Sequence, residues 1–437
     1  MDYPWLVLYS TILILLLFVM FKQKKLPYAI VFVVAFVFFP LFSTMGLGGL
    51  LLPSDATHFC VLLSVFGFFF FYEIGKKMKV KPSYGGLETF EVCYDTRYGL
   101  LILGNLACLA VYLYLLPNVK EYYAVHMLSD GRQEATDVFL GGSARMAALY
   151  SNTVKPIASV SFLILIDNLF RGKKIHYLAG ILCLLNMILD SLIFAGRALL
   201  VQCFFYVIFS LVFFRNEVKL TKKQKKILVS VALFVLSLFI FVVIFISQGR
   251  SGGDSEGVMT NHLIWYYVGP FVLFDYYVNN HDLLSLSTDS NFFFGSCLFG
   301  PIYNLGFMVV SALIPSIDYQ GSDHLIAVVT QNTYAPIASG GVYINAAVTA
   351  MYPFVKDFWF VGLFLGFGFY GWLLGYLEKS YKKDSSQKIR LITLIILYVI
   401  FKLEMRYELG PTMVIQIILI LFFIKKRIVR NESKKNS

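Results

Sequence analysis

Three arginines stand apart from the lysine-rich turns of this chain, because they lie in loops or at the ends of apolar segments. Arg197 follows a glycine at the tight turn between two apolar segments, and Arg250 follows a glycine at the start of a polar stretch. Arg406 lies between two glutamates in another short turn. A guanidinium group is a planar fork that suits phosphate and pyrophosphate. We therefore interpret these three arginines as candidate ligands of a diphosphate.

Each arginine also has a structural interpretation. A charge close to lipid is costly and is usually either functional or paired. Arg197 can reach lipid headgroups or pair with Asp190, and Arg250 can anchor a flexible turn at the membrane interface. Arg406 can be held by the glutamates on either side of it. The sequence leaves both interpretations open for all three.

The long segment from 248 to 357 carries the other polar side chains that could do chemistry. Its candidate general bases are Asp275, Asp323 and His324, since carboxylates and imidazoles accept protons. Its candidate ligands for sugar rings and hydroxyls are Tyr266, Tyr267, Asn332, Tyr334 and Tyr343. Aromatic side chains also favour the membrane interface, which is the structural alternative for the tyrosines.

Several catalytic motifs are missing from the sequence. It has no phosphate-binding loop of the Gly-x-x-x-x-Gly-Lys type and no His-Glu-x-x-His. Its six cysteines are scattered along the chain without a Cys-x-x-Cys pair. We therefore expect no metal site and no cofactor. It also lacks the Asp-x-Asp motif with which many soluble glycosyltransferases bind nucleotide sugars. A transferase built on this chain would therefore use a lipid-linked donor.

The elements that must position these residues are apolar. Of 437 residues, 58% are hydrophobic and 14% are charged, whereas soluble domains have about 25% charged residues. Apolar runs of about 20 residues predict membrane-spanning helices, because backbone in lipid must be hydrogen-bonded internally. We expect an all-α polytopic membrane protein with about 11 spans, or about 12 or 13 if the outer segment holds more.

The predicted spans are 5–21, 28–45, 59–74, 98–116, 154–170, 176–195, 198–214, 227–246, 358–377, 391–403 and 411–424. Lysine-rich turns alternate with the others, which places the N-terminus outside and the C-terminus in the cytoplasm. The net charge of +11 is spread over these turns and does not indicate nucleic-acid binding.

The chain therefore divides into three predicted regions. Residues 1–247 form a bundle of about eight spans. Residues 248–357 form a large extracytoplasmic segment, and residues 358–437 form the last spans and a basic tail. Within the outer segment we expect an interfacial helix at 265–278. The stretch 292–315 spans the membrane, re-enters it or lies at its surface, and the sequence does not decide between these.

At three places the sequence resembles the Wzy-type oligosaccharide repeat-unit polymerases, which make O-antigens and capsules. The residues are Gly196-Arg197; then Arg250-Ser251, Tyr266-Tyr267-Val268-Gly269-Pro270 and Phe274-Asp275; then Asn332-Thr333-Tyr334, Met351-Tyr352, Lys356-Asp357-Phe358 and Gly362. At the last place family members tend to have Asp-Phe-Gly, and Trp359 takes the position of that glycine here.

The resemblance implies an enzyme of the bacterial cytoplasmic (inner) membrane with a fold similar to the GT-C class of lipid-dependent transferases. Its substrate would be an undecaprenyl-diphosphate-linked oligosaccharide in the lipid bilayer, polymerised on the outer face. Chain-length regulator and flippase proteins would be its partners. Two other functions stay open, an O-antigen ligase-type transferase and a flippase or transporter for lipid-linked oligosaccharides.

Overall fold

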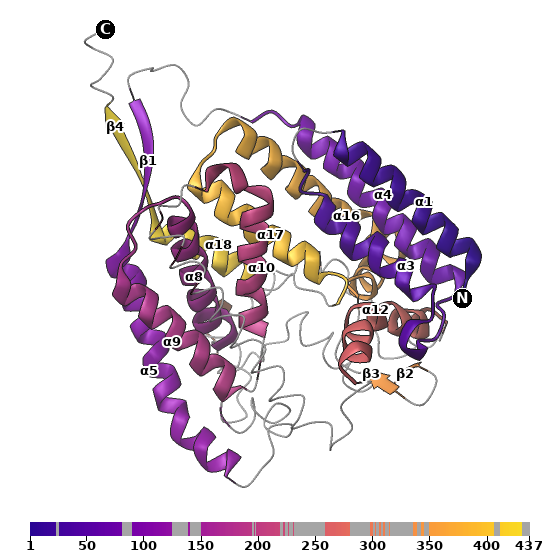
Figure 1. The fold of residues 1–437 in the computed structure, drawn as a ribbon, viewed down its shortest axis with the longest axis horizontal. Helices are drawn as coiled ribbons and strands as arrows, with labels where there is room; N and C mark the ends of the chain where they lie inside the picture. Colours follow the sequence, from indigo (N-terminus) through magenta and orange to yellow (C-terminus); the bar gives the residue numbers. More distant parts are fainter. Residues whose placement is uncertain are drawn as a thin grey trace. The chain divides into compact units, whose positions relative to one another are not determined.

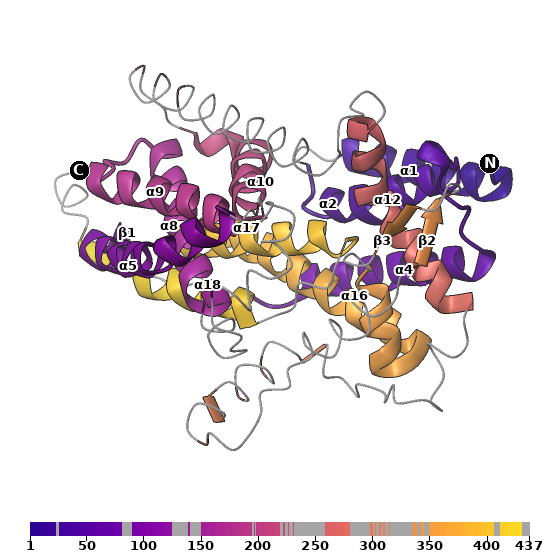
Figure 2. The same ribbon diagram turned by 90° about the horizontal axis from the view of Figure 1, so that it is seen from below.

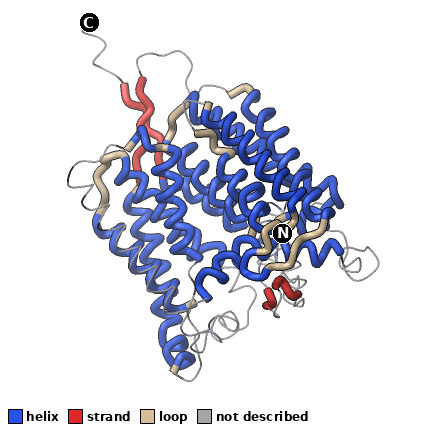
Figure 3. Tube along the Cα trace, turned by 45° about the vertical axis from the view of Figure 1, so that its right-hand side comes forward, coloured by secondary structure: helices blue, strands red, loops and turns tan. Residues whose placement is uncertain are grey.

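We analysed the protein in a computed structural model. The structure describes residues 1–22, 26–80, 90–124, 139, 150–194, 196, 198–218, 222, 226, 230, 258–279, 298–299, 302, 306, 309–310, 314, 335–338, 342–344, 349–405 and 411–430. The described chain is mainly helical, with short strands (Figure 3).

The chain folds as two compact units (Figure 1). Unit 1 comprises Met1–Val80, Glu256–Lys383 and Ile396–Met413, and unit 2 comprises Lys81–Ser255, Asp384–Ile395 and Val414–Ser437. The helices of unit 1 are α1 (Tyr3–Phe21), α2 (Ile30–Val33), α3 (Phe39–Ser43), α4 (Asp55–Lys77), α12 (Val258–Asn279) and α16 (Met351–Lys383). The helices of unit 2 are α5 (Tyr98–Tyr123), α8 (Lys155–Phe170), α9 (Tyr177–Ile193) and α10 (Ala198–Phe213). Both units contribute to α17 (Gln387–Lys402) and α18 (Pro411–Phe423).

Short elements complete both units. In unit 1, a π-turn η1 (Val34–Phe38) joins α2 to α3, a short turn η2 (Leu47–Gly49) follows, and β2 (Ala335–Ala338) pairs with β3 (Val342–Ile344). In unit 2, η3 (Tyr150–Val154) precedes α8 and η4 (Arg215–Glu217) follows α10. There, β1 (Phe90–Thr96) pairs with β4 (Ile424–Arg430).

The described helices coincide with the predicted spans, except that 227–246 lies outside the described residues apart from residue 230. The helices long and apolar enough to cross a membrane are Tyr3–Met20, Asp55–Lys77, Tyr98–Tyr123, Tyr150–Phe170 and Met351–Lys383. Shorter apolar helices are Ile30–Ser43, Tyr177–Ile193, Ala198–Phe213 and Thr412–Phe423. These helices fit an all-α membrane protein, and the number of spans stays a prediction.

The closest helix pair of unit 1 is α4 with α16, which lie side by side (Figure 1). A Cβ atom on Gly371 of α16 would lie 2.1 Å from the carbonyl oxygen of Phe68 on α4. A Cβ atom on Gly75 of α4 would lie 2.2 Å from the carbonyl oxygen of Trp372. The two backbones approach this closely only because glycine has no side chain, as in other packed membrane helices.

Helix α16 breaks near its start and folds back on itself. Phe358 (φ −147, ψ 34) and Trp359 (φ 58, ψ −149) are not helical. A Cβ atom on Gly362 would lie 1.8 Å from the carbonyl oxygen of Phe354, and the Phe354 ring lies 5.2 Å from that of Phe367. Eight residues of a straight helix span about 12 Å. Residues 351–357 therefore lie alongside the long part of α16, an arrangement that the prediction of a single span at 358–377 did not include.

The helix predicted at 265–278 is present as α12 and rests on the N-terminal part of unit 1. Trp265 Nε1 donates to the carbonyl oxygen of Gly48 at 2.9 Å, and Phe271 lies 5.9 Å from Phe36 in an edge-on contact. Strand β2 contacts α12, and Figure 2 shows both strands of this sheet beside it. Of the stretch 292–315 the structure describes only isolated positions.

The predicted alternation of spans places certain helix ends of unit 1 on the same side of the membrane. Contacts within unit 1 join such helix ends to each other. Asp2, before α1, donates its backbone N–H to the carbonyl oxygen of Thr44, after α3, at 2.8 Å. At the opposite ends of the helices, the backbone N–H of Tyr28 donates to Glu378 at 3.3 Å. These contacts agree with alternating spans, and the orientation of the chain in the membrane stays a prediction.

Unit 2 holds polar pairs between its helices. Asn186 of α9 donates to the side-chain oxygen of Asn105 of α5 at 3.1 Å, and Asn105 donates to Ser161 of α8 at 2.8 Å. Strands β1 and β4 are antiparallel, with Asp95 opposite Lys425. The prediction of an all-helical chain missed both two-stranded sheets. Strands β1 and β4 are far apart in sequence, whereas β2 and β3 are neighbours within the predicted outer segment.

We predict that Gly371→Leu destabilises the protein by about 1–3 kcal/mol or more, because the side chain forces α4 and α16 apart. Thermal unfolding of the purified protein in detergent measures this. Gly180→Leu is the matched control, since nothing lies within 4 Å of a Cβ atom at Gly180 in the first turn of α9, and replacing a helical glycine by leucine should be neutral or stabilising by up to about 1 kcal/mol. A Gly371→Leu protein that unfolds at the same temperature as the wild type would contradict the close packing of α4 and α16.

Candidate functional site

The predicted site residues fall into two groups. Asp275, Tyr266 and Tyr267 lie on α12, and Tyr343 lies in β3, where only the backbone is described. The others lie outside the described residues: Arg197, Arg250, Arg406, Asp323, His324, Asn332 and Tyr334. The described candidate site is therefore the surroundings of α12 and of the broken start of α16 in unit 1.

Asp275 joins α12 to the N-terminus of α4. Its Oδ1 accepts hydrogen bonds from the Ser54 backbone N–H at 2.8 Å, from Thr57 Oγ1 at 2.9 Å and from Ser54 Oγ. Its Oδ2 accepts one from Asn279 at 3.0 Å. A carboxylate suits this place, because the first N–H groups of a helix lack partners and carry partial positive charge. To act as a general base, Asp275 would have to exchange one of these donors for a substrate hydroxyl.

The two neighbouring tyrosines of α12 differ in their surroundings. Tyr267 stacks on Phe39 at 5.3 Å between ring centroids and lies 6.2 Å from Phe401. Tyr266 is exposed. Of this pair, Tyr266 is the ring whose position suits stacking on a sugar.

The start of α16 places two charged residues directly before the helix break. Asp357 is buried, and its Oδ2 accepts a hydrogen bond from the backbone N–H of Leu298 at 2.7 Å. Lys356 is only 3% exposed, and its Nζ has no hydrogen-bond partner among the described residues. In the sequence, Lys356 belongs to the Lys356-Asp357-Phe358 segment of the resemblance, but no chemical role was predicted for it. The signal that could have found it is a Lys-Asp pair between apolar residues.

Trp359 is the one non-glycine residue with positive φ in the described part of the chain. Its combination of φ 58 and ψ −149 belongs to a region that glycine alone adopts readily, and other residues there cost about 1–3 kcal/mol. Trp359 also takes the position at which the Wzy-type pattern has the glycine of Asp-Phe-Gly. The backbone here therefore has a conformation that favours glycine, although the residue is tryptophan.

In unit 2, a cluster of side chains surrounds Asp190 near the end of α9, shortly before Arg197 in the sequence. Asp190 accepts hydrogen bonds from Tyr112 at 3.0 Å and from Tyr150. The Lys155 ammonium lies 5.0 Å from the ring centroid of Tyr150 and 5.8 Å from that of Phe194. Asp190 therefore has tyrosine partners, and Lys155 adds positive charge to this cluster.

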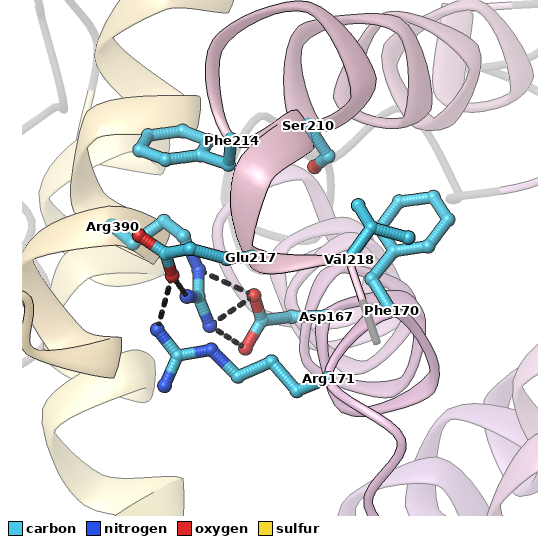
Figure 4. A pocket seen from close by; sticks show the side chains of 8 residues that line it. All are labelled: Asp167, Phe170, Arg171, Ser210, Phe214, Glu217, Val218 and Arg390. Carbon is cyan, nitrogen blue, oxygen red and sulfur yellow. Dashed lines mark hydrogen bonds and ion pairs between the residues drawn. The ribbon is translucent and has the colours of Figure 1, made fainter. Parts of the chain in front are cut away.

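A second charged cluster in unit 2 binds helices together (Figure 4). Arg390 of α17 lies between Asp167 of α8 and Glu217 of η4 (Figure 4). Its Nε and Nη2 donate to the two Asp167 oxygens at 2.6 Å each, and its Nη1 donates to Glu217 at 2.6 Å. Arg171 also donates to Glu217, at 2.8 Å.

The hollow beside these residues holds about 10 Å³, which is room for about one water molecule. All four charges have partners. We therefore interpret this cluster as structural rather than catalytic. The sequence analysis gave these residues no role.

Among the described residues, no group of three histidine, cysteine, aspartate or glutamate side chains could hold a metal ion.

Comparison with models of known protein families, with curated proteins and with solved structures finds no match.

We predict that Trp359→Gly is more stable than Trp359→Ala by about 1 kcal/mol or more, because only glycine adopts this backbone conformation without strain. The same pair at Phe360, the next residue in the helix, should show the opposite order by about 1 kcal/mol. Thermal unfolding of the four variants measures both differences. Equal or reversed stabilities at Trp359 would exclude the strained turn.

We also predict that Arg390→Met destabilises the protein by about 3–5 kcal/mol, because it leaves the buried carboxylate of Asp167 without its ion pair. Arg215→Met is the control, since Arg215 lies in η4 with Glu217 but is exposed. Surface substitutions usually change the stability of a protein by less than about 0.5 kcal/mol. Similar unfolding temperatures for both variants would show that the Arg390 pairing contributes little.

Proposed function

We propose that this protein polymerises undecaprenyl-diphosphate-linked oligosaccharide repeat units into O-antigen, capsular or exopolysaccharide. The reaction is glycosyl transfer on the outer face of the bacterial cytoplasmic membrane. One described observation carries this proposal most directly: the glycine-like backbone of Trp359.

The position of the strained backbone supports this proposal. The Wzy-type pattern calls for glycine after Asp-Phe, and glycine is needed where φ is positive or space is short. In this chain the residue after Asp357-Phe358 is the one described non-glycine residue with positive φ. Sequence letters alone contain no such information, because tryptophan does not favour this conformation. The backbone of the turn thus adds an observation that favours the resemblance to the residues that suggested it.

The proposed mechanism assigns the diphosphate to the arginines. Arg197, Arg250 and Arg406 hold the donor diphosphate, and their charge stabilises the anion that develops as it leaves. The acceptor hydroxyl oxygen bonds to the anomeric carbon, the bond from that carbon to the diphosphate oxygen breaks, and undecaprenyl diphosphate departs. Asp323, His324 or Asp275 accepts the hydroxyl proton. The tyrosines of the outer segment, Tyr266 among them, contact the glycan.

The proposal includes a topology and an architecture. The chain spans the membrane about 11 times, with its N-terminus outside, its C-terminus in the cytoplasm and residues 248–357 forming most of the outer segment. The fold resembles the GT-C class. Chain-length regulator and flippase proteins are its expected partners. The charge pattern of the turns and the alternating helix ends of unit 1 support this arrangement.

A deletion strain tests the function. We expect loss of the long glycan ladder, with a single repeat unit still attached to its surface acceptor, because polymerisation alone is missing. Gel analysis of the surface glycan and of the lipid-linked intermediates measures this. Full-length polymer stranded on undecaprenyl diphosphate would instead identify a ligase. A single repeat unit trapped on the cytoplasmic face would identify a flippase.

We predict that Arg197→Ala lowers the polymerisation rate by about 100- to 1,000-fold, because one charge-stabilising donor to the leaving group is lost. Complementation of the deletion strain, with protein levels checked by immunoblot, measures it as loss of the ladder. Arg215→Ala is the control, since it removes an arginine from a predicted cytoplasmic turn and should leave the ladder normal. A normal ladder with Arg197→Ala would exclude this residue from the diphosphate site.

A further inference from the structure

Two cationic side chains are buried in the described part of the chain, Arg390 and Lys356. Their surroundings differ. Every guanidinium nitrogen of Arg390 donates to a carboxylate, whereas the Lys356 ammonium has no partner among the described residues. Burying an unpaired charge is costly, so such a residue in an apolar setting usually marks a functional site.

The adjacent carboxylate does not serve as a partner. Asp357 is next in sequence, but the described contact of its Oδ2 is with the backbone N–H of Leu298. No carboxylate among the described residues forms an ion pair with Lys356, whereas such pairs are present at Glu73, Glu217, Glu378 and Asp167. A counter-ion for Lys356 therefore has to come from elsewhere.

The backbone provides a second, independent observation. Lys356 lies at the end of the folded-back segment, three residues before the strained Trp359. Strained backbone persists where the surrounding structure fixes it, and it is concentrated at ligand-binding and active sites. The fold-back, fixed by the contact of Phe354 with Gly362 and Gly366, holds Lys356 in its buried position.

We propose that Lys356 is the counter-ion of a phosphate group carried by a lipid. An ammonium group binds phosphate as a point charge and does not need the paired geometry of a guanidinium. A phosphate on a lipid supplies the missing negative charge without bringing a large polar molecule into an apolar bundle. Resting on the proposed function, we assign this phosphate to the diphosphate of the lipid-linked substrate, for which Lys356 adds a cation to the predicted arginines.

The test uses the purified full-length protein in phosphatidylcholine nanodiscs. Undecaprenyl diphosphate is added in one arm and phosphatidylglycerol in the other, and the rise in unfolding temperature is followed against lipid concentration. The variants are Lys356→Met, Lys356→Gln and, as a control, Lys22→Met, which removes an exposed lysine at the end of α1. Lys356→Gln serves if the methionine variant does not fold.

For the wild type and for Lys22→Met, we expect undecaprenyl diphosphate to raise the unfolding temperature. Losing a charged hydrogen bond should weaken binding by about 10- to 100-fold in the Lys356 variants. Without ligand, Lys356→Met should unfold at the wild-type temperature or higher, because an unpaired buried charge has been removed. A purely structural lysine would give the opposite result, a lower unfolding temperature with ligand stabilisation intact.

The two lipids separate the two proposals. A response to phosphatidylglycerol alone that depends on Lys356 would support a phosphate site and count against the proposed substrate. A response to undecaprenyl diphosphate that depends on Lys356 supports both. Wild-type responses in both Lys356 variants, or no response of the wild type to either lipid, would overturn the phosphate site.

Discussion

The close backbone contact between α4 and α16 is the constraint on which the rest of unit 1 depends. Glycines on both helices, Gly75 and Gly371 among them, let each backbone touch the other, so the position of α16 is set by α4. The N-terminus of α4 in turn receives Asp275 from α12. The folded-back start of α16 packs on the helix so positioned. Small side chains in one interface therefore determine where the charged residues before Trp359 lie, although none of these glycines contacts them.

The helices could be predicted from the sequence because apolar length is a local property. The runs at 5–21, 98–116 and 198–214 coincide with described helices, and each is visible in about 20 consecutive residues. Pairings between distant segments have no such local signal. Strand β1 finds its partner in the chain's last element, and Arg390 finds Asp167 at a separation of 223 residues. The fold-back at Trp359 could not be predicted for another reason. Its backbone conformation has a positive φ, and tryptophan does not favour that conformation.

The candidate site was predictable to the extent that chemistry is carried by residue type. Asp275 was predicted as a candidate general base because it is a carboxylate beside aromatic residues. The sequence could not show that the start of α4 would supply its hydrogen-bond donors. Lys356 belonged to the resemblance without a chemical role, because the sequence does not distinguish it from a lysine near the end of an apolar run whose flexible side chain reaches solvent. Here the reversal of the chain buries it. Burial, which depends on the tertiary fold, distinguishes a candidate ligand from an ordinary surface lysine.

The long sequence separation within unit 2 has a consequence for how the protein is made. Asp167 and Glu217 are synthesised well before Arg390, and the strand β4 that pairs with β1 comes near the end of the chain. At about 5–20 residues per second, the 223 residues between Asp167 and Arg390 take about 10–45 seconds to add. During that interval Asp167 lacks the arginine that neutralises it, whereas Glu217 can already pair with Arg171. Unit 2 therefore reaches its final set of ion pairs and strand pairs only when the last elements of the chain have been made.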